Sequence, residues 1–184
     1  MARYREPFPT KGGEVLIRNA EAEDAAKLFE FMRYVDRETT FLAREPGEFD
    51  ASYTLEQETS LLGGWAESAA KLFLVVETPE GELAATCGCN FDNSRRRSRH
   101  RAEVAISVRQ DFWRMGLGRR LLQTQFDWCR QNDVEKLCLT VDTGNLRALG
   151  LYLSLGFEVE GTLRREAKMP DGTYRDFYTM AKFL

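Results

Sequence analysis

Hydrophobic positions recur along the chain with two different periods, which predicts a mixture of strands and helices. Residues 15–18 and 72–76 are short runs rich in aliphatic and β-branched side chains, so we expect both to be strands. A helix is expected between them, because apolar residues recur at i, i+3, i+4 and i+7: Ala25, Leu28, Phe29 and Met32. A second helix is expected over residues 55–68, although Gly63-Gly64 weakens it, and residues 36–53 are polar and irregular.

The second half of the chain continues this alternation. After a turn at residues 79–82 we expect strands at 83–91 and 104–108, a helix at 117–132, a strand at 137–141, a helix at 145–155 and strands at 157–168 and 174–183. The predicted order is β-α-α-β-β-β-α-β-α-β-β, an α/β fold in which helices cover a mixed sheet. We expect a single domain over residues 1–184, in which residues 1–13 form a flexible N-terminal arm.

Composition excludes several classes of protein. The chain has 184 residues with 26 Lys and Arg against 29 Asp and Glu, and a net charge of −3 points to neither a nucleic-acid nor a membrane partner. No apolar run approaches the ~18–20 residues of a membrane-spanning helix, and the first residues lack a secretory signal, so we expect a cytoplasmic protein. The four cysteines form no Cys-x-x-Cys pair and His100 is the only histidine, so we expect no metal. Reduced, buried thiols are favoured over a disulfide or soft-metal site at Cys87 and Cys89.

The most informative segment joins a predicted strand to a predicted helix through a glycine turn. Residues 106–108 end the strand, and the turn reads Arg114-Met115-Gly116-Leu117-Gly118-Arg119. Exposed N–H groups at a helix start hold anions, above all phosphates, and the two arginines add charge-assisted donors. No P-loop run exists in the chain, and Leu121 stands where a dinucleotide-binding turn needs its third glycine. An NAD-dependent enzyme is therefore a disfavoured alternative.

Two stretches of the second half follow one family's pattern. The segment Trp113-Arg114-Met115-Gly116-Leu117-Gly118 fits Gln/Arg-x-x-Gly-x-Gly/Ala except at Trp113, and residues 145–157 fit Asn-x-x-Ala-x-x-Leu-Tyr-x-x-x-Gly-Phe. Together, and in this order, they resemble the GNAT superfamily of acyl-CoA-dependent N-acetyltransferases. Residues 17–25 and 161–180 are similar to the family's opening strand and helix and to its closing hairpin, so the resemblance covers nearly the whole chain.

The resemblance implies acetyl-CoA as co-substrate and assigns residues to it. The pyrophosphate would lie on the turn formed by Arg114, Met115, Gly116, Leu117, Gly118 and Arg119. The pantetheine arm would pair like an extra strand with the main chain of Ile106, Ser107 and Val108, which a splayed strand at 137–141 would leave free. Asn145, a good helix cap, would contact CoA or a water.

Acetyl transfer to an amine also needs groups that move protons. Tyr152 is the candidate general acid for the leaving sulfur, because a phenol is protonated at neutral pH; the alternative is a core tyrosine on an amphipathic helix. Glu103 is the candidate base, on the same face of its strand as Ala105 and Ser107, where partial burial would raise its pKa. Its alternative is a strand-end glutamate paired with Arg101, and Asp176 or Glu38 could also contribute.

We therefore expect an N-acetyltransferase that uses direct attack of a primary amine in a ternary complex. The acceptor would be an amine-bearing small molecule or a protein or peptide, bound by residues 33–53 and the last hairpin. A non-catalytic acyl-CoA-binding or sensing module on the same fold is the second hypothesis. The run of arginines at residues 95–101 is interpreted as a solvated loop, because no aromatic residues for stacking are interleaved with it. The sequence does not decide the oligomeric state, although homodimers are frequent among similar proteins.

Overall fold

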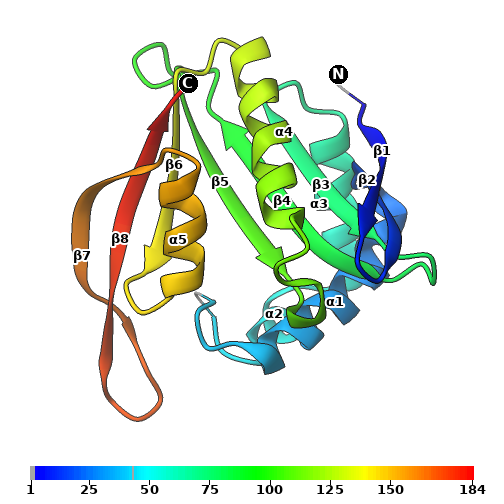
Figure 1. Cartoon of the computed structure of the whole chain (residues 1–184), viewed down its shortest axis with the longest axis horizontal. Helices are drawn as coiled ribbons and strands as arrows, with labels where there is room; N and C mark the ends of the chain where they lie inside the picture. Colours follow the sequence, from blue (N-terminus) through cyan, green and yellow to red (C-terminus); the bar gives the residue numbers. More distant parts are fainter. Residues whose placement is uncertain (1–2, 43) are drawn as a thin grey trace.

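The computed structural model describes residues 3–42 and 44–184, which form a mixed sheet with helices on both faces (Figure 1). The eight strands found in these residues lie in the order β1-β2-β3-β4-β5-β6-β8-β7. Every neighbouring pair is antiparallel except β5 and β6, which are parallel. The predicted mixed α/β fold is confirmed. No helix in the described part of the chain is both long and apolar enough to cross a membrane.

The elements follow the predicted order with two additions, a first strand and a short helix. The strands are β1 (Arg5–Thr10), β2 (Gly13–Asn19), β3 (Lys71–Glu77), β4 (Leu83–Phe91), β5 (Arg101–Val108), β6 (Lys136–Asp142), β7 (Glu158–Lys168) and β8 (Tyr174–Phe183). The α-helices are α1 (Ala25–Glu38), α2 (Glu48–Ser52), α3 (Leu55–Ala66), α4 (Leu117–Gln131) and α5 (Leu146–Ser154). Single 3₁₀ turns, η1 (Ala22–Asp24) and η2 (Gln110–Phe112), precede α1 and α4.

The two faces of the sheet bury separate hydrophobic clusters. Along β3 the side chains alternate: Leu72, Leu74 and Val76 join the cluster beneath α4 and α5, whereas Val75 joins the one beneath α1 and α3. This period of two is the geometry of a strand buried on both faces. Burying each such aliphatic side chain contributes about 1.5–3 kcal/mol, so both helical layers are held firmly on the strands that position the site.

The prediction of a flexible arm over residues 1–13 is wrong for residues 5–10, and residues 1–2 lie outside the part of the chain that the structure describes. Arg5–Thr10 forms the edge strand β1, which pairs with β2 along its whole length. Pro7 and Pro9 concealed this strand in the sequence, because proline lacks the N–H that a central strand donates. At an edge, two prolines spaced by two can both face away from the neighbouring strand. Glu6 of β1 also forms an ion pair with Arg120, which ties β1 to α4.

One further prediction needs correction, and another is confirmed, between residues 36 and 66. The segment 36–53 is not irregular throughout, because α1 continues to Glu38 and α2 occupies residues 48–52. The expected helix at 55–68 is confirmed as α3, which ends slightly earlier. Thr54 caps α3 by accepting a hydrogen bond from the N–H of Gln57 at 3.2 Å. This cap stabilises the helix by ~1 kcal/mol and offsets part of the cost of its two glycines.

Candidate active site

The parallel strands β5 and β6 are hydrogen-bonded to each other at one end only. Their register joins Arg101 with Lys136, Ala102 with Leu137 and Glu103 with Cys138. Beyond these pairs β5 continues to Val108 beside β4, and β6 continues to Asp142 beside β8. Figure 1 shows the two strands diverging from their shared end. The inner edge of β5 is therefore open, and the splayed strand that the resemblance implied is confirmed.

The alternation of hydrogen bonds along β5 decides which main-chain groups face this opening. The N–H of Arg109 donates to β4 at 3.0 Å. Because successive residues of an antiparallel strand direct their main-chain groups to opposite edges, Ser107 also faces β4, whereas Ile106 and Val108 face the opening. The carbonyl of Val108 accepts a hydrogen bond from Trp113 Nε1 at 2.7 Å rather than from β4. Of the three predicted strand positions, Ile106 and Val108 are thus the two whose main-chain groups face the opening, and the Val108 carbonyl is already bonded to Trp113.

The turn between β5 and α4 has the backbone of an anion-binding loop. Arg114 (φ 62°) and Gly116 (φ 87°) are both left-handed, and α4 begins at Leu117. Among the described residues, no acceptor takes the N–H groups of residues 114–119. Free successive N–H groups in such a turn form a concave nest with partial positive charge, which the dipole of α4 reinforces.

Two glycines keep side chains out of this turn. A Cβ on Gly118 would lie 3.1 Å from Cδ2 of Leu151 on α5, so a larger residue would require the Leu151 side chain to move by a few tenths of an ångström. Gly116 has a left-handed backbone that side-chain-bearing residues rarely adopt, and its open side meets only Phe8 of β1, 3.5 Å from where a Cβ would lie. A phosphate can therefore approach main-chain N–H groups directly, and the residues present fit the pyrophosphate of CoA.

The side chains of the turn divide between charge and packing. Arg119 Nη2 donates to Ser154 Oγ on α5 at 2.7 Å, and this neutral partner leaves the positive charge unbalanced. Arg114 is exposed and has no carboxylate partner in the part of the chain that the structure describes. Leu117 is buried in the core and Met115 is half-buried, so these two hold the turn in place.

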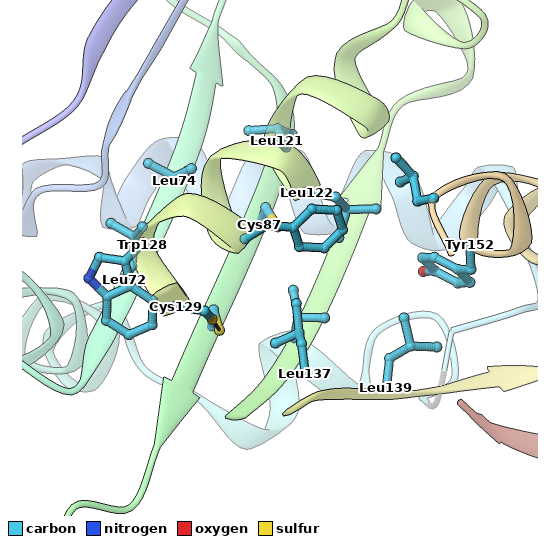
Figure 2. Close-up of a cluster of buried hydrophobic side chains, with 14 of the residues drawn as sticks. Leu72, Leu74, Cys87, Leu121, Leu122, Trp128, Cys129, Leu137, Leu139 and Tyr152 are labelled. Carbon is cyan, nitrogen blue, oxygen red and sulfur yellow. Dashed lines mark hydrogen bonds between the residues drawn. The ribbon is translucent and has the colours of Figure 1, made fainter. Parts of the chain in front are cut away.

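Helix α5 carries the other two predicted residues, Asn145 and Tyr152. Asn145 caps the helix, since its Oδ1 accepts the N–H of Ala148 at 3.1 Å. Tyr152 is 7 % exposed, and burial, followed by the nearby Cys87 thiol, raises the pKa of its phenol. No described residue forms a hydrogen bond with this hydroxyl. Figure 2 shows the phenol oxygen pointing from α5 toward the strands, on the side where Leu139 of β6 lies. A buried phenol that keeps its proton can serve as a donor.

Glu103 lies at the closed end of the opening, and the partial burial predicted for it is wrong. Its side chain is 68 % exposed, and its Oε1 accepts a hydrogen bond from Arg101 Nη2 at 3.0 Å. Helices α1 and α3 pack on β3 and β4 and leave the same face of β5 uncovered at Glu103 and Ala105. The ion pair with Arg101 is the alternative that the sequence left open. The role of Glu103 as a base stays a prediction.

The segment after α1 crosses the open end of the two strands. Glu38 accepts hydrogen bonds from Gln110, at 2.9 Å from its main-chain N–H and 2.5 Å from its side chain. On the other side, Arg175 of β8 donates to the carbonyl and to the hydroxyl of Thr40, each at 3.0 Å. Residues 33–53 and the last hairpin, which the sequence expected to form the acceptor pocket, therefore do meet. Arg175 was not predicted, because no local pattern marks a strand residue that contacts a distant loop.

Other features that the sequence singled out lie away from the opening. The arginine run forms an exposed loop beyond the closed end of β5, and Cys87, Cys89 and Cys129 are buried free thiols. Two small cavities, of about 230 and 240 Å³, lie beside α1 and α2 and between the ends of α3 and α4. The first cavity is lined by residues of the segment 33–53 expected to bind the acceptor, but neither cavity is lined by Glu103, Tyr152 or the residues assigned to CoA. The candidate site for the co-substrate is therefore the open edge of β5 with its adjoining turn.

Comparison with known proteins identifies the family. The model of the "Acetyltransferase (GNAT) family" matches residues 20–157. The crystal structure of a GNAT-family acetyltransferase from Streptococcus pneumoniae has a TM-score of 0.83 and 32 % identity, covering 92 % of this chain and 99 % of that one. The L-amino acid N-acetyltransferase AaaT of Escherichia coli is 26 % identical over 92 % of this chain and 98 % of its own. The ribosomal protein bS18-alanine N-acetyltransferase of Escherichia coli is 45 % identical, but the match spans 33 % of this chain and 40 % of that enzyme. The open edge of β5, the glycine turn and these matches agree, and the chain belongs to the GNAT acetyltransferase family.

Proposed function

We propose that the protein transfers the acetyl group of acetyl-CoA to a primary amine by direct attack in a ternary complex. The observation that carries this proposal is the open edge of β5 beside the left-handed turn at residues 114–118. An extended ligand with a pyrophosphate in its middle fits both features at once, because a strand edge binds an amide-containing arm and a helix start binds phosphate.

The chain's own groups would hold the co-substrate at three places. The N–H groups of residues 114–119 would bind the pyrophosphate, with Arg114 and Arg119 adding charge. Ile106 and Val108 would pair with the pantetheine arm, and Asn145 would contact CoA or a water from the start of α5. When bound, acetyl-CoA supplies a thioester whose carbonyl accepts a nucleophile. A free main-chain N–H of β5 would polarise that carbonyl as charge develops on its oxygen.

Two side chains would move protons. Tyr152 would donate to the departing sulfur, which its raised pKa allows because the phenol stays protonated through the neutral range. Glu103 would accept the proton of the amine, directly or through water, on the exposed face of β5 opposite to α4. Neither step needs a metal ion or a covalent enzyme intermediate.

The acceptor would be the α-amine of an amino acid or of a peptide N-terminus. The amino acid acetyltransferase AaaT aligns with 92 % of this chain and 98 % of its own. The bS18-alanine acetyltransferase aligns with only 33 % of it, so the free amino acid is favoured as the first acceptor to test. Phe41 and Arg175 lie where the segment after α1 crosses the open end of β5 and β6, and the Arg175 guanidinium lies 5.2 Å from the centre of the Phe41 ring.

Thermal unfolding with acetyl-CoA, CoA and NAD tests the proposal, because a ligand that binds only the folded state raises the melting temperature. We compare wild type with Gly116→Trp, which fills the turn, and with Gly172→Trp. Gly172 has nearly the same left-handed φ, 83° against 87°, but lies in the β7–β8 turn, so it controls for backbone strain.

The expected result is a rise with acetyl-CoA in wild type and Gly172→Trp that Gly116→Trp abolishes, followed by release of CoA thiol with amino acids. No rise in a cooperatively unfolding wild type would refute the proposal. A rise without thiol release from any amino acid, peptide or polyamine would instead support a non-catalytic acyl-CoA-binding module, and a rise with NAD alone would support a nucleotide-dependent enzyme.

A further inference from the structure

Arg147 is the charged residue of the second motif to which no role has been assigned. It is exposed on the first turn of α5, and its guanidinium carbon lies 3.7 Å from the centroid of the Trp113 ring. Within the described residues no carboxylate pairs with it. Its charge is therefore held in place by stacking on an aromatic face and is not neutralised.

Trp113 is a rigid platform for this guanidinium. Its Nε1 donates to the carbonyl of Val108 at 2.7 Å, which fixes the plane of the indole against the end of β5. It also immediately precedes Arg114, the first residue of the phosphate-binding turn. In the sequence pattern of this turn, position 113 is where a Gln or Arg side chain is expected, and Trp113 supplies no cation of its own.

Helix α5 is fixed against the same turn at two further points. Arg119 donates to Ser154 at 2.7 Å, and Gly118 allows Leu151 to approach closely. Arg147 therefore projects from a helix whose position relative to the turn is set by packing. A guanidinium stacked face-on keeps the N–H groups of its edge free, and this planar fork matches two phosphate oxygens.

We propose that Arg147, held on Trp113, is a third phosphate-binding arginine that supplies from α5 the charge missing at position 113. Its ligand is a phosphate of the nucleotide half of CoA, either the pyrophosphate or the 3′-phosphate. The inference rests on the proposed function, since it concerns the same co-substrate. It assigns a binding role to a side-chain pair, Trp113 and Arg147, that lies in two different motifs.

Isothermal titration calorimetry with acetyl-CoA and with 3′-dephospho-acetyl-CoA tests this role in the absence of any acceptor. Arg147→Gln is expected to weaken acetyl-CoA about tenfold, equivalent to ~1.4 kcal/mol, and to reduce the dependence of Kd on salt. Arg130→Gln, at the far end of α4, is the matched control and is expected to change neither. An equal loss for both ligands assigns Arg147 to the pyrophosphate, and a loss confined to acetyl-CoA assigns it to the 3′-phosphate.

Variants of the platform separate binding from folding. Trp113→Phe keeps an aromatic face and is expected to retain more affinity for acetyl-CoA than Trp113→Ala. In the double variant, Arg147→Gln is expected to cause little further loss of affinity beyond that of Trp113→Ala, because both changes remove the same pair. A Kd for Arg147→Gln within twofold of wild type, or a loss with unchanged salt dependence, would overturn the inference. If wild type itself fails to bind acetyl-CoA, the proposed function fails instead, so the two failures are distinguishable.

Discussion

Arg175 on β8 and Asp142 at the end of β6 form an ion pair, with Nη1 3.0 Å from Oδ2, although the Asp142 side chain is only 4 % exposed. The other oxygen of the carboxylate accepts the N–H of Gly144 at 2.7 Å, and the same guanidinium holds Thr40. One side chain thus neutralises a buried carboxylate and fastens the segment after α1 to the splayed half of the sheet. The position of the segment after α1 across the open end of β5 and β6 therefore depends on Arg175.

Replacing Arg175 with Met is expected to lower the free energy of unfolding by about 2–3 kcal/mol. Removing one partner leaves a buried charge uncompensated, which costs more than the pair itself contributes, and the partial exposure of Arg175 reduces the loss below that of a fully buried pair. Urea unfolding of Arg175→Met, Asp142→Asn and the double variant measures this. The double variant should lose less than the two single losses combined, and strict additivity would contradict the coupling.

Replacing Tyr152 with Phe is expected to lower kcat about 10²-fold while leaving the Kd for acetyl-CoA unchanged, because the hydroxyl acts only on the leaving sulfur. Burial raises the pKa of Tyr152, so its proton is retained from about pH 7 to 9 and the ratio of the two kcat values should be constant across that range. Stability should not fall, since no described residue bonds the hydroxyl. Tyr178→Phe, which removes a hydroxyl from the same hydrophobic cluster, is the control. Equal kcat values for wild type and Tyr152→Phe would mean that Tyr152 only packs in the hydrophobic core and is not the general acid.

The features that the sequence predicted best are those coded by neighbouring residues. The turn at 114–119 and the α5 motif are each formed by consecutive residues. Their glycines and the capping Asn145 directly indicate where a turn ends and a helix begins. The edge strand β1 was missed because Pro7 and Pro9 oppose a central strand but not an edge. Phe8 of β1 nevertheless lies beside Gly116, so the site depends in part on a segment that the local sequence pattern predicted to be a flexible arm.

What could not be predicted involves residues far apart in the chain. The period of two placed Glu103 on the correct face of β5, but not whether a helix covers that face, which depends on where α1 and α3 pack. Arg147 stood within a recognised motif, yet its partner Trp113 belongs to another element, and only the packing of α5 against the turn brings them together. The role of Arg175 was unpredictable for the same reason, because its contacts to Thr40 and Asp142 join three separate segments of the chain.

Replacing Glu58 with Gln is expected to raise the melting temperature at pH 7 by ~2–4 °C, the shift that ~1 kcal/mol produces in a domain of this size. Glu58 is buried on α3 without a polar partner among the described residues, and desolvation raises its pKa. Glu58 therefore binds a proton more readily in the folded state than in the unfolded state. The loss of stability caused by its buried charge is absent below the pKa of Glu58 in the unfolded state, and it appears as the pH rises through the pKa in the folded state. Calorimetry between about pH 4 and 8 should show the gain vanishing at the acidic end. Glu56→Gln, exposed on the same helix, should show no gain, and a gain that persists in acid would contradict a charge-based cause.

Replacing Glu103 with Gln is expected to lower kcat/KM about tenfold. This is less than a buried base would lose, because the carboxylate is exposed and water can replace it in part. The comparison that decides its role is Arg101→Gln, which breaks the same ion pair from the other side. If Glu103 accepts the proton of the amine, only Glu103→Gln should lose activity. Similar small losses in both variants would mean that the pair only secures the start of β5, and that water alone deprotonates the acceptor.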